Sequence, residues 1–358
     1  ISERVRDRYE LGDPKRELAD SLYPLALYTT EQHERADEPF DEYMQTYEEG
    51  GNREIVMFHR ASNSLILGNM REAAEQYSDF LEAYPESERF LDNAFADLAI
   101  ARFNLEDYPA AIGAAESLVE ARPDSAQVGR TLNIAGDAYS FMAASLGQGD
   151  ESDEQREEWE QAAIDSYLAA FEAARKSESA DANREEYHKT VASEALWKAA
   201  DLYYQRGEIE KGLARYDMFF PDYAGTPWEP QISVFSLEHL EEAGRGEEGL
   251  EQVEKMVLLL GNKPPEQQDT QLLRQAIGSY ADASVRIRGV DETFATLGDF
   301  PGADPENQAL LTWLKIQQVI VMQQAQKNME KDTPEYAAAE ARIEEVFESL
   351  RLFDKRNL

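Results

Sequence analysis

The chain repeats a segment of its own sequence. Residues 68–85 (GNMREAAEQYSDFLEAYP) are echoed by residues 106–123 (EDYPAAIGAAESLVEARP), so the first residues and the closing prolines both lie 38 positions apart. A period of this size is typical of stacked copies of one small unit, because a single unit cannot bury its apolar face alone. The repeat therefore constrains the fold class more than any other feature of the chain.

Each copy is predicted to contain a helix A, a tight turn and a helix B. In the first clear copy these are residues 53–67, the turn Gly68-Asn69, and residues 70–83. Glycine accepts the left-handed conformation after a helix end, and Pro85 stops helix B because proline lacks the N–H that the next turn needs. We therefore predict an all-α fold, a right-handed superhelical solenoid of antiparallel helix hairpins. Flanking helices are expected at residues 14–28, 39–47, 270–286, 307–329 and 334–353.

The pattern resembles the tetratricopeptide repeat family. Ala135-Gly136-x2-Tyr139 and Ala73-x3-Tyr77 with the closing Pro85 match its consensus, although the period exceeds the usual length of about 34. The longer period predicts helices about one turn longer. We expect an N-terminal helical cap at 1–52, the repeats at 53–260, and divergent C-terminal helical repeats with a cap at 261–358.

The net charge limits the choice of partners. The chain has 72 acidic against 35 basic residues, a net charge of −37. This charge argues against nucleic acid or anionic membrane as a partner, because both attract a basic surface. Two interpretations of the acidity stay open: a solvated, salt-adapted surface, or a surface that docks a basic partner.

Several kinds of segment and site are missing from the sequence. It contains no cysteine, and no apolar run approaches the ~20 residues of a membrane-spanning helix. Because the chain begins at Ile1 rather than at methionine, we expect it to be a piece of a longer precursor from which any targeting segment has been lost.

An acidic insertion at residues 147–158 interrupts the third hairpin. Seven carboxylates and one arginine lie between Asp150 and Glu160, without the spacing of a calcium loop. We expect a solvated loop or an extension of the following helix, and a weak cation site is the remaining alternative.

No catalytic motif is present, so we expect neither an enzyme nor a bound cofactor or metal. The four histidines do not stand at metal-ligand spacing. Residues 244–249 fit Gly-x-Gly-x-x-Gly, but a helix is expected before them instead of the strand that a dinucleotide site needs. Glu247 and Glu248 would also repel a pyrophosphate, and the repeat pattern already accounts for the three glycines.

The family resemblance implies a binding groove. In that family the A helices line the concave face, where a partner docks as an extended peptide or a helix. Transferred by register, this implies a partner-binding set of Phe58, Phe103, Asn133, Phe141, Glu194, Trp197, Asp201 and Tyr204. The last four share one helical stripe by their spacing. For Phe58 and Phe103, packing against a neighbouring helix stays an open alternative.

We therefore predict a non-catalytic scaffold that binds other proteins and assembles a complex. Tyr84-Pro85-Glu-Ser87 and Arg122-Pro123-Asp-Ser125 resemble segments of bacterial envelope members of the family. This resemblance implies a periplasmic or outer-membrane-associated protein, with a cytoplasmic one as the alternative. The competing function is a regulatory or substrate-recruiting module of a larger enzyme, and a third is a solute- or glycan-binding solenoid.

Overall fold

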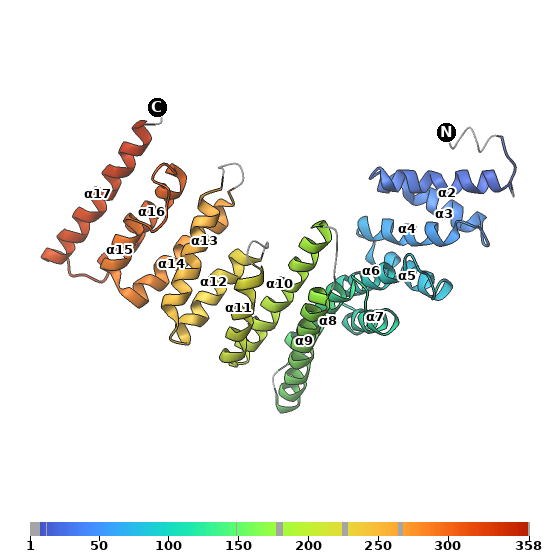
Figure 1. Cartoon of the computed structure of the whole chain (residues 1–358), viewed down its shortest axis with the longest axis horizontal. Helices are drawn as coiled ribbons and strands as arrows, with labels where there is room; N and C mark the ends of the chain where they lie inside the picture. The colour runs from blue at the N-terminus through green and yellow to red at the C-terminus, as the bar shows by residue number, and fades with distance from the viewer. Residues whose placement is uncertain are drawn as a thin grey trace. The chain divides into compact units, whose positions relative to one another are not determined.

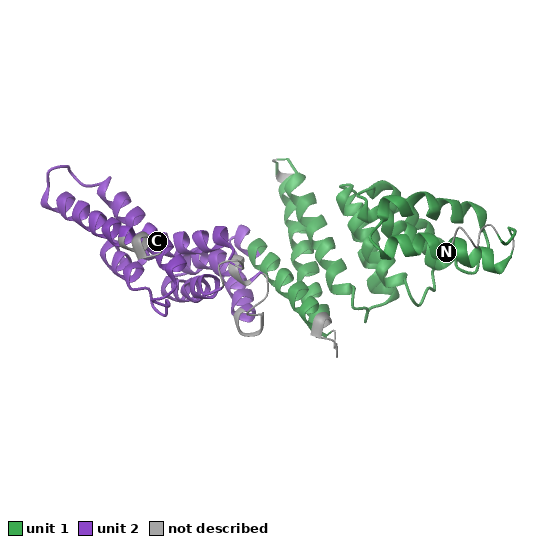
Figure 2. Cartoon of the chain, turned by 90° about the horizontal axis from the view of Figure 1, so that it is seen from above, with its two compact units in different colours: residues 1–202 green, residues 203–358 purple. Residues whose placement is uncertain are grey.

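The structure is a computed structural model that describes residues 8–11, 13–147, 149–176, 182–223, 228–263 and 268–356. The described residues form sixteen helices, α2 to α17, and no strand (Figure 1). The predicted all-helical class is confirmed. Packing divides the chain into two compact units, residues 1–202 and 203–358, and the division falls near the end of α10 (Figure 2). The domain boundaries predicted after residues 52 and 260 rest on the type of repeat and not on packing, and they stay predictions.

Unit 1 is a series of helix hairpins followed by most of α10. Its helices are α2 (Pro14–Thr29), α3 (His33–Thr46), α4 (Arg53–Ile66), α5 (Met70–Ala83), α6 (Leu91–Asn104), α7 (Tyr108–Ala121), α8 (Val128–Ser145), α9 (Asp150–Lys176) and α10 (Ala182–Gln205).

Unit 2 continues in the same way after the end of α10. Its helices are α11 (Ile209–Tyr223), α12 (Glu229–Glu242), α13 (Gly246–Gly261), α14 (Thr270–Arg288), α15 (Val290–Gly298), α16 (Gln308–Gln326) and α17 (Pro334–Arg356).

Within each unit the first helix of one hairpin also packs on the first helix of the next. In unit 1 these A-helix contacts run from α2 to α4, α6 and α8, and in unit 2 from α12 to α14 and α16. The A helices therefore form a continuous layer in each unit. This arrangement is the tetratricopeptide-like stacking of hairpins that the 38-residue repeat predicts.

One turn geometry recurs between helices A and B. After α4, Gly68 has φ +80°, its N–H donates to the Leu65 carbonyl at 3.1 Å, and the Asn69 N–H donates to the Ser64 carbonyl at 2.9 Å. This pair of bonds defines a Schellman motif, which satisfies carbonyls that the helix end leaves open. The same pair and the same sign of φ recur at Glu31, Glu106, Gly207 and Gly244.

Close helix crossings explain the other glycines of the Gly-x-Gly-x-x-Gly match. A Cβ on Gly246 would lie 2.6 Å from Cδ1 of Ile287, and one on Gly249 would lie 2.9 Å from Cδ1 of Leu237. Both positions are packing positions, while Gly244 supplies the left-handed turn. A helix, α12, precedes the motif, as expected from the repeat and unlike a dinucleotide site.

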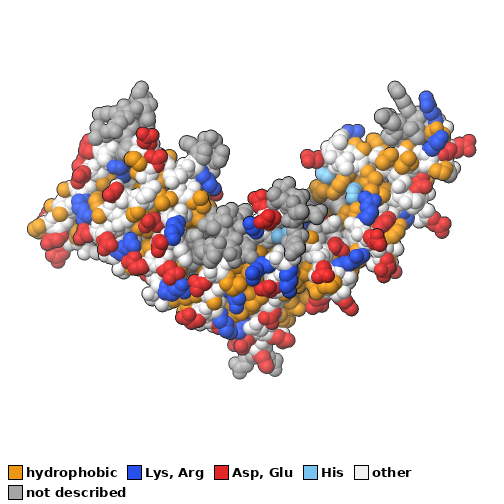
Figure 3. Space-filling model, in the orientation of Figure 1, with side chains coloured by type: hydrophobic (Ala, Val, Ile, Leu, Met, Phe, Trp, Pro, Cys, Tyr) orange, Lys and Arg blue, Asp and Glu red, His pale blue; other side chains and the backbone are white. Residues whose placement is uncertain are grey.

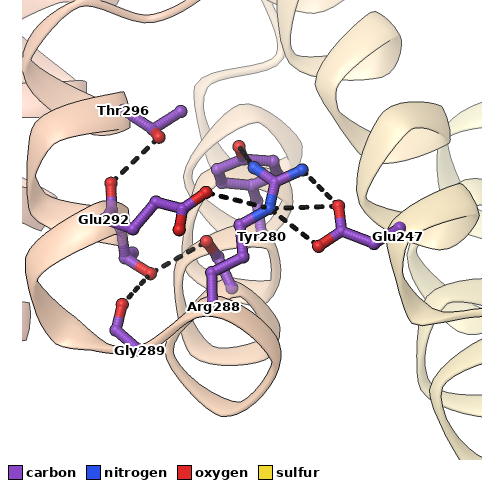
Figure 4. A network of polar contacts seen from close by, with 8 residues as sticks. Glu247, Tyr280, Arg288, Gly289, Glu292 and Thr296 are labelled. Atoms are coloured by element: carbon purple, nitrogen blue, oxygen red, sulfur yellow. Dashed lines mark hydrogen bonds and ion pairs between the residues drawn. The ribbon is translucent and has the colours of Figure 1, made fainter.

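Arg288 joins three helices in unit 2 (Figure 4). From the last turn of α14, its guanidinium reaches Glu247 of α13 at 2.5 Å, Glu292 of α15 at 3.9 Å and the hydroxyl of Tyr280 at 3.3 Å. The hydrogen bond from Arg288 holds the pKa of Glu247 below its usual value. Together these contacts fix the end of α14 against both neighbouring helices.

One expected boundary needs correction, and one open alternative is decided. Helix α3 begins at His33, six residues before the predicted start at Pro39, so this proline lies inside the helix and forgoes its own N–H bond there. For the acidic insertion, the second of the two expected forms holds: from Asp150 onward it contributes the first turns of a 27-residue α9, and residue 148 lies outside the described residues. Arg156 ties this extension to the end of α8, donating to the carbonyls of Leu146 at 3.3 Å and Gly147 at 2.7 Å.

Candidate functional site

Charged side chains link the A helices of unit 1. We call this set the polar ladder: Asp97 on α6, Arg130 and Asp137 on α8, and Glu194 and Lys198 on α10. Arg130 lies 3.9 Å from Asp97, and the Lys198 ammonium lies 2.8 Å from Asp137 and 2.7 Å from Glu194. The ladder thus crosses three A helices and contains three carboxylates against two cations.

Buried tyrosines from the B helices hold two of these carboxylates in place. Tyr77 of α5 donates to Asp97 at 2.9 Å, and Tyr167 of α9 donates to Asp137 at 2.7 Å. Burial raises the pKa of both tyrosines, so their hydroxyls stay protonated donors. The tyrosines of the B helices α5 and α9 therefore also orient acidic side chains of the A-helix face.

Burial and neighbouring charges act against each other in the ladder. Burial raises the pKa of Asp97, while the Tyr77 hydrogen bond and Arg130 lower it, and the net shift is upward. For Lys198, burial would lower the pKa, but Asp137 and Glu194 outweigh it and raise the pKa. Lys198 is therefore a permanently charged link between α8 and α10 at neutral pH.

An aromatic cluster lies on α6, α7 and α8. We call Phe103, Tyr108 and Phe141 the aromatic patch: Phe141 stacks on Tyr108 with ring centroids 5.6 Å apart and meets Phe103 edge-on at the same distance. Phe141 is nevertheless 53% exposed. It lies four residues after Asp137, so these two residues share one helical stripe of α8.

The predicted site residues fall into several environments. Phe103 and Phe141 come together in the aromatic patch, and Glu194 belongs to the polar ladder. Asn133 is buried and donates to the Val191 carbonyl at 3.2 Å, so its amide joins α8 to α10. Trp197 and Asp201 are half-buried on α10.

Phe58 and Tyr204 lie in the interior of their units. Phe58 is buried and stacks on Phe90 with centroids 4.4 Å apart, the packing alternative considered for it above. Tyr204 is buried in unit 2, where its ring stacks on His239 at 3.3 Å and lies 5.9 Å from Tyr216. Trp197 belongs to unit 1. The partner surface proposed below therefore does not depend on Phe58 or Tyr204.

Sequence reasoning missed Lys198, Tyr108 and the tyrosine hydroxyls. Lys198 carried a usable signal, since it stands four residues after Glu194, a favourable spacing for an ion pair on a helix. The contact between Tyr108 and Phe141 joins α7 to α8 across the hairpins and leaves no comparable trace in the sequence.

The described residues offer no obvious metal or membrane site. Among them, no three His, Asp or Glu side chains converge as metal ligands would, and none of their helices has the length and hydropathy that crossing a membrane requires. Figure 3 shows acidic and basic side chains mixed with apolar ones over the visible face of the described residues.

No protein-family model and no curated protein matches the chain. Solved structures with a similar fold include a tetratricopeptide repeat protein from Parabacteroides merdae ATCC 43184, at 11% identity and TM-score 0.45, covering 87% of this chain and 98% of that one. MamA from Desulfovibrio magneticus RS-1 has 14% identity and TM-score 0.40, covering 59% and 96%. The apo quorum sensor NprR from B. thuringiensis has 13% identity and TM-score 0.47, covering 99% and 90%. At these values the similarities concern the helical repeat fold and carry no functional conclusion.

Proposed function

We propose that the chain is a non-catalytic scaffold that binds partner proteins on the A-helix face of unit 1. The observation that carries this proposal is Phe141, a large aromatic side chain that is 53% exposed yet held by Phe103 and Tyr108. Aromatic anchors of this kind supply much of the binding energy at protein interfaces, because they bury a large area at little cost in side-chain entropy.

The polar ladder supports a basic partner segment. Asp97, Asp137 and Glu194 together carry one more charge than Arg130 and Lys198 neutralise, in a chain whose net charge is −37. A Lys- or Arg-containing segment would complement this face and would associate faster at low salt. Trp197 and Asp201, half-buried on the same face of α10 by their spacing, extend the proposed surface.

The proposal includes assembly of a bacterial envelope complex, supported by the two proline-containing phrases, with a cytoplasmic protein as the alternative. The competing function, a recruiting module of a larger enzyme, would place the same surface beside a catalytic domain. Fractionation of the source cells with an antibody against the chain separates the envelope from the cytoplasmic location. Recovery in the periplasmic or outer-membrane fraction supports the envelope assignment, and recovery in the cytosol contradicts it.

Photo-crosslinking tests the surface itself. A benzoyl-phenylalanine at position 141 should capture a partner in the source cells, whereas one at Leu22 of α2, equally exposed at 53%, should not. With the captured partner purified, Phe141→Ala should weaken binding by about 2 kcal/mol or more, and Leu22→Ala should change it little. Equal losses from the two variants would show that Phe141 is not an anchor.

A separate measurement tests the prediction that the chain does not bind nucleic acid. Fluorescence anisotropy with a labelled RNA oligonucleotide should show no saturable binding even at low salt, because the acidic surface repels phosphate. Saturable binding that weakens with salt would contradict the proposal that the partner is a protein.

A further inference from the structure

Unit 2 contains a groove of its own between the A helices α14 and α16. It has a volume of about 620 Å³, and it is lined by Thr270, Gln271, Arg274, Gln275, Ile277, Trp313, Ile316, Gln317 and Ile320. A volume of this size lies within the range of ligand-binding clefts.

The lining differs in charge from the rest of the chain. Among the residues that the structure describes, no Asp or Glu lines the groove, although 72 of the 358 residues are acidic, and the one charged residue of this described lining is Arg274. The Arg274 guanidinium lies over the Trp313 ring, 4.8 Å from its centroid. This cation–π contact orients the guanidinium and keeps a positive charge at the groove. The groove therefore favours an anionic ligand, unlike the carboxylate-rich face of unit 1.

The remaining lining residues suit a peptide in extended form. Trp313, Ile316 and Ile320 lie on one stripe of α16 by their spacing of three and four, and Ile320 is 36% exposed. Gln271, Gln275 and Gln317 each offer an amide donor and acceptor. Backbone N–H and C=O groups of an extended segment need such partners, whereas a helix satisfies its own.

We propose that this groove binds an extended acidic peptide segment of a partner protein. An apolar side chain of the segment packs on the Trp313–Ile320 stripe, a neighbouring carboxylate pairs with Arg274, and the main chain bonds to the glutamine amides. Nucleic acid fits less well, because one cation is too few for a run of phosphates. This site is separate from the partner surface proposed for unit 1 and has the opposite charge preference.

Selection from a phage-displayed library of random peptides against the whole chain tests the proposal. The enriched sequences should combine Asp or Glu with a large apolar residue, and a synthetic peptide from that set should bind saturably. Enrichment of basic sequences, or of none, would overturn the proposal. A second copy of this chain, which has acidic segments of its own, is a further possible occupant. If the chain self-associates and the selected peptide competes with this self-association, the occupant is the chain itself and the partner assignment is overturned.

Charge reversal locates the peptide. Arg274→Glu should weaken binding of the selected peptide about thirtyfold or more, because it replaces the cation that pairs with the peptide carboxylate by a charge that repels it. The matched control is Arg351→Glu on α17, which changes the net charge equally at a side chain that is 64% exposed and lies outside the groove. It should change the affinity less than about threefold.

Further measurements separate loss of this groove from loss of the fold and from loss of the partner surface on unit 1. Thermal unfolding of Arg274→Glu should match that of Arg351→Glu, and Arg274→Gln should give an intermediate affinity in a folded protein. Phe141→Ala should leave the peptide affinity unchanged, so failure of one site is distinguishable from failure of the other. Equal weakening by Arg274→Glu and Arg351→Glu would show that net charge, and not this groove, governs the binding.

Discussion

The ring of Tyr167 lies against Gly136 while its hydroxyl donates a 2.7 Å hydrogen bond to Asp137, the next residue of α8. A Cβ on Gly136 would lie 2.6 Å from Cδ1 of that ring. The small residue of the repeat consensus therefore does two things: it lets α8 and α9 cross closely, and it brings the tyrosine hydroxyl to a carboxylate of the polar ladder.

We expect Gly136→Ala to lower the free energy of unfolding by about 1–3 kcal/mol, because the added methyl group overpacks a tight crossing. Gly113→Ala on α7 is the matched control, since a Cβ there meets nothing within 4 Å. That substitution should raise stability by about 0.5–1 kcal/mol, because alanine loses less backbone entropy in a helix. Urea unfolding of both variants measures the difference, and equal effects would refute the crossing argument.

Tyr77 and Asp97 form the corresponding contact at α5 and α6. Tyr77→Phe should cost about 1–3 kcal/mol, because it leaves Asp97 and the Ser62 hydroxyl without the bonds they make to the buried phenol. Asp97→Asn should cost less than Tyr77→Phe, since an amide oxygen still accepts from Tyr77 and no charge is buried.

The pH dependence of the same pair has a definite sign. The pKa of Asp97 is raised in the folded protein, so the folded state holds this proton to a higher pH than the unfolded chain does. The contribution of Asp97 to stability therefore decreases as pH rises above about 4 toward its folded pKa. Thermal melts of the wild type and Asp97→Asn over this window should diverge in the variant's favour, and a constant difference would contradict the assignment.

The hairpin repeat was predictable because its signals are local. Helix α5 spans the predicted residues 70–83, and Gly68 adopts the left-handed turn expected of it. The two proline-containing phrases also have a structural role: the Ser87 N–H donates to the Tyr84 carbonyl at 3.1 Å, and the Ser125 N–H to the Arg122 carbonyl at 3.0 Å. Both phrases therefore make the same turn between hairpins.

The site was harder to predict because register along a helix does not decide which neighbour covers a side chain. Phe58 and Phe141 were both assigned to the groove by the same transfer, yet Phe90 covers Phe58 while Phe141 is exposed. Tyr204 was assigned to the surface by its spacing from Trp197, and the structure buries it. These outcomes depend on contacts with the next hairpin, which no spacing within α4 or α10 specifies.

His59 gives unit 1 a sensitivity to mild acid. It packs among Tyr28, Phe58 and Phe90, and burial, helped by the charge of Arg89, lowers its pKa. The unfolded chain therefore takes up this proton first, so the contribution of His59 is complete above about pH 6.5 and is lost as pH falls toward its folded pKa.

Replacing His59 with leucine tests this sign. The stability that the wild type loses between about pH 7.5 and 5.5 should exceed the loss in His59→Leu, because leucine does not titrate. The control is His33→Leu, which changes a second histidine of unit 1. A variant His59→Leu that loses as much stability as the wild type over this range would show that other groups govern the acid sensitivity.

Glu106 occupies a position where the other copy of the repeat has a glycine. Its φ of +60° matches the +80° of Gly68, and both residues follow an A helix with the same pair of Schellman hydrogen bonds. A side chain with a Cβ is strained in this left-handed region, whereas glycine adopts it freely. We therefore expect Glu106→Gly to raise the free energy of unfolding by about 0.5–1 kcal/mol, after the greater entropy of glycine in the unfolded chain is deducted.

The reciprocal change Gly68→Glu should lower the free energy of unfolding by about 1 kcal/mol, since a Cβ there meets no atom within 4 Å and only the backbone is strained. Urea unfolding of the two single variants and of the double variant should give opposite and additive shifts, because the turns lie in different hairpins. Destabilisation by Glu106→Gly would mean that the glutamate side chain contributes more at this turn than its strained backbone costs.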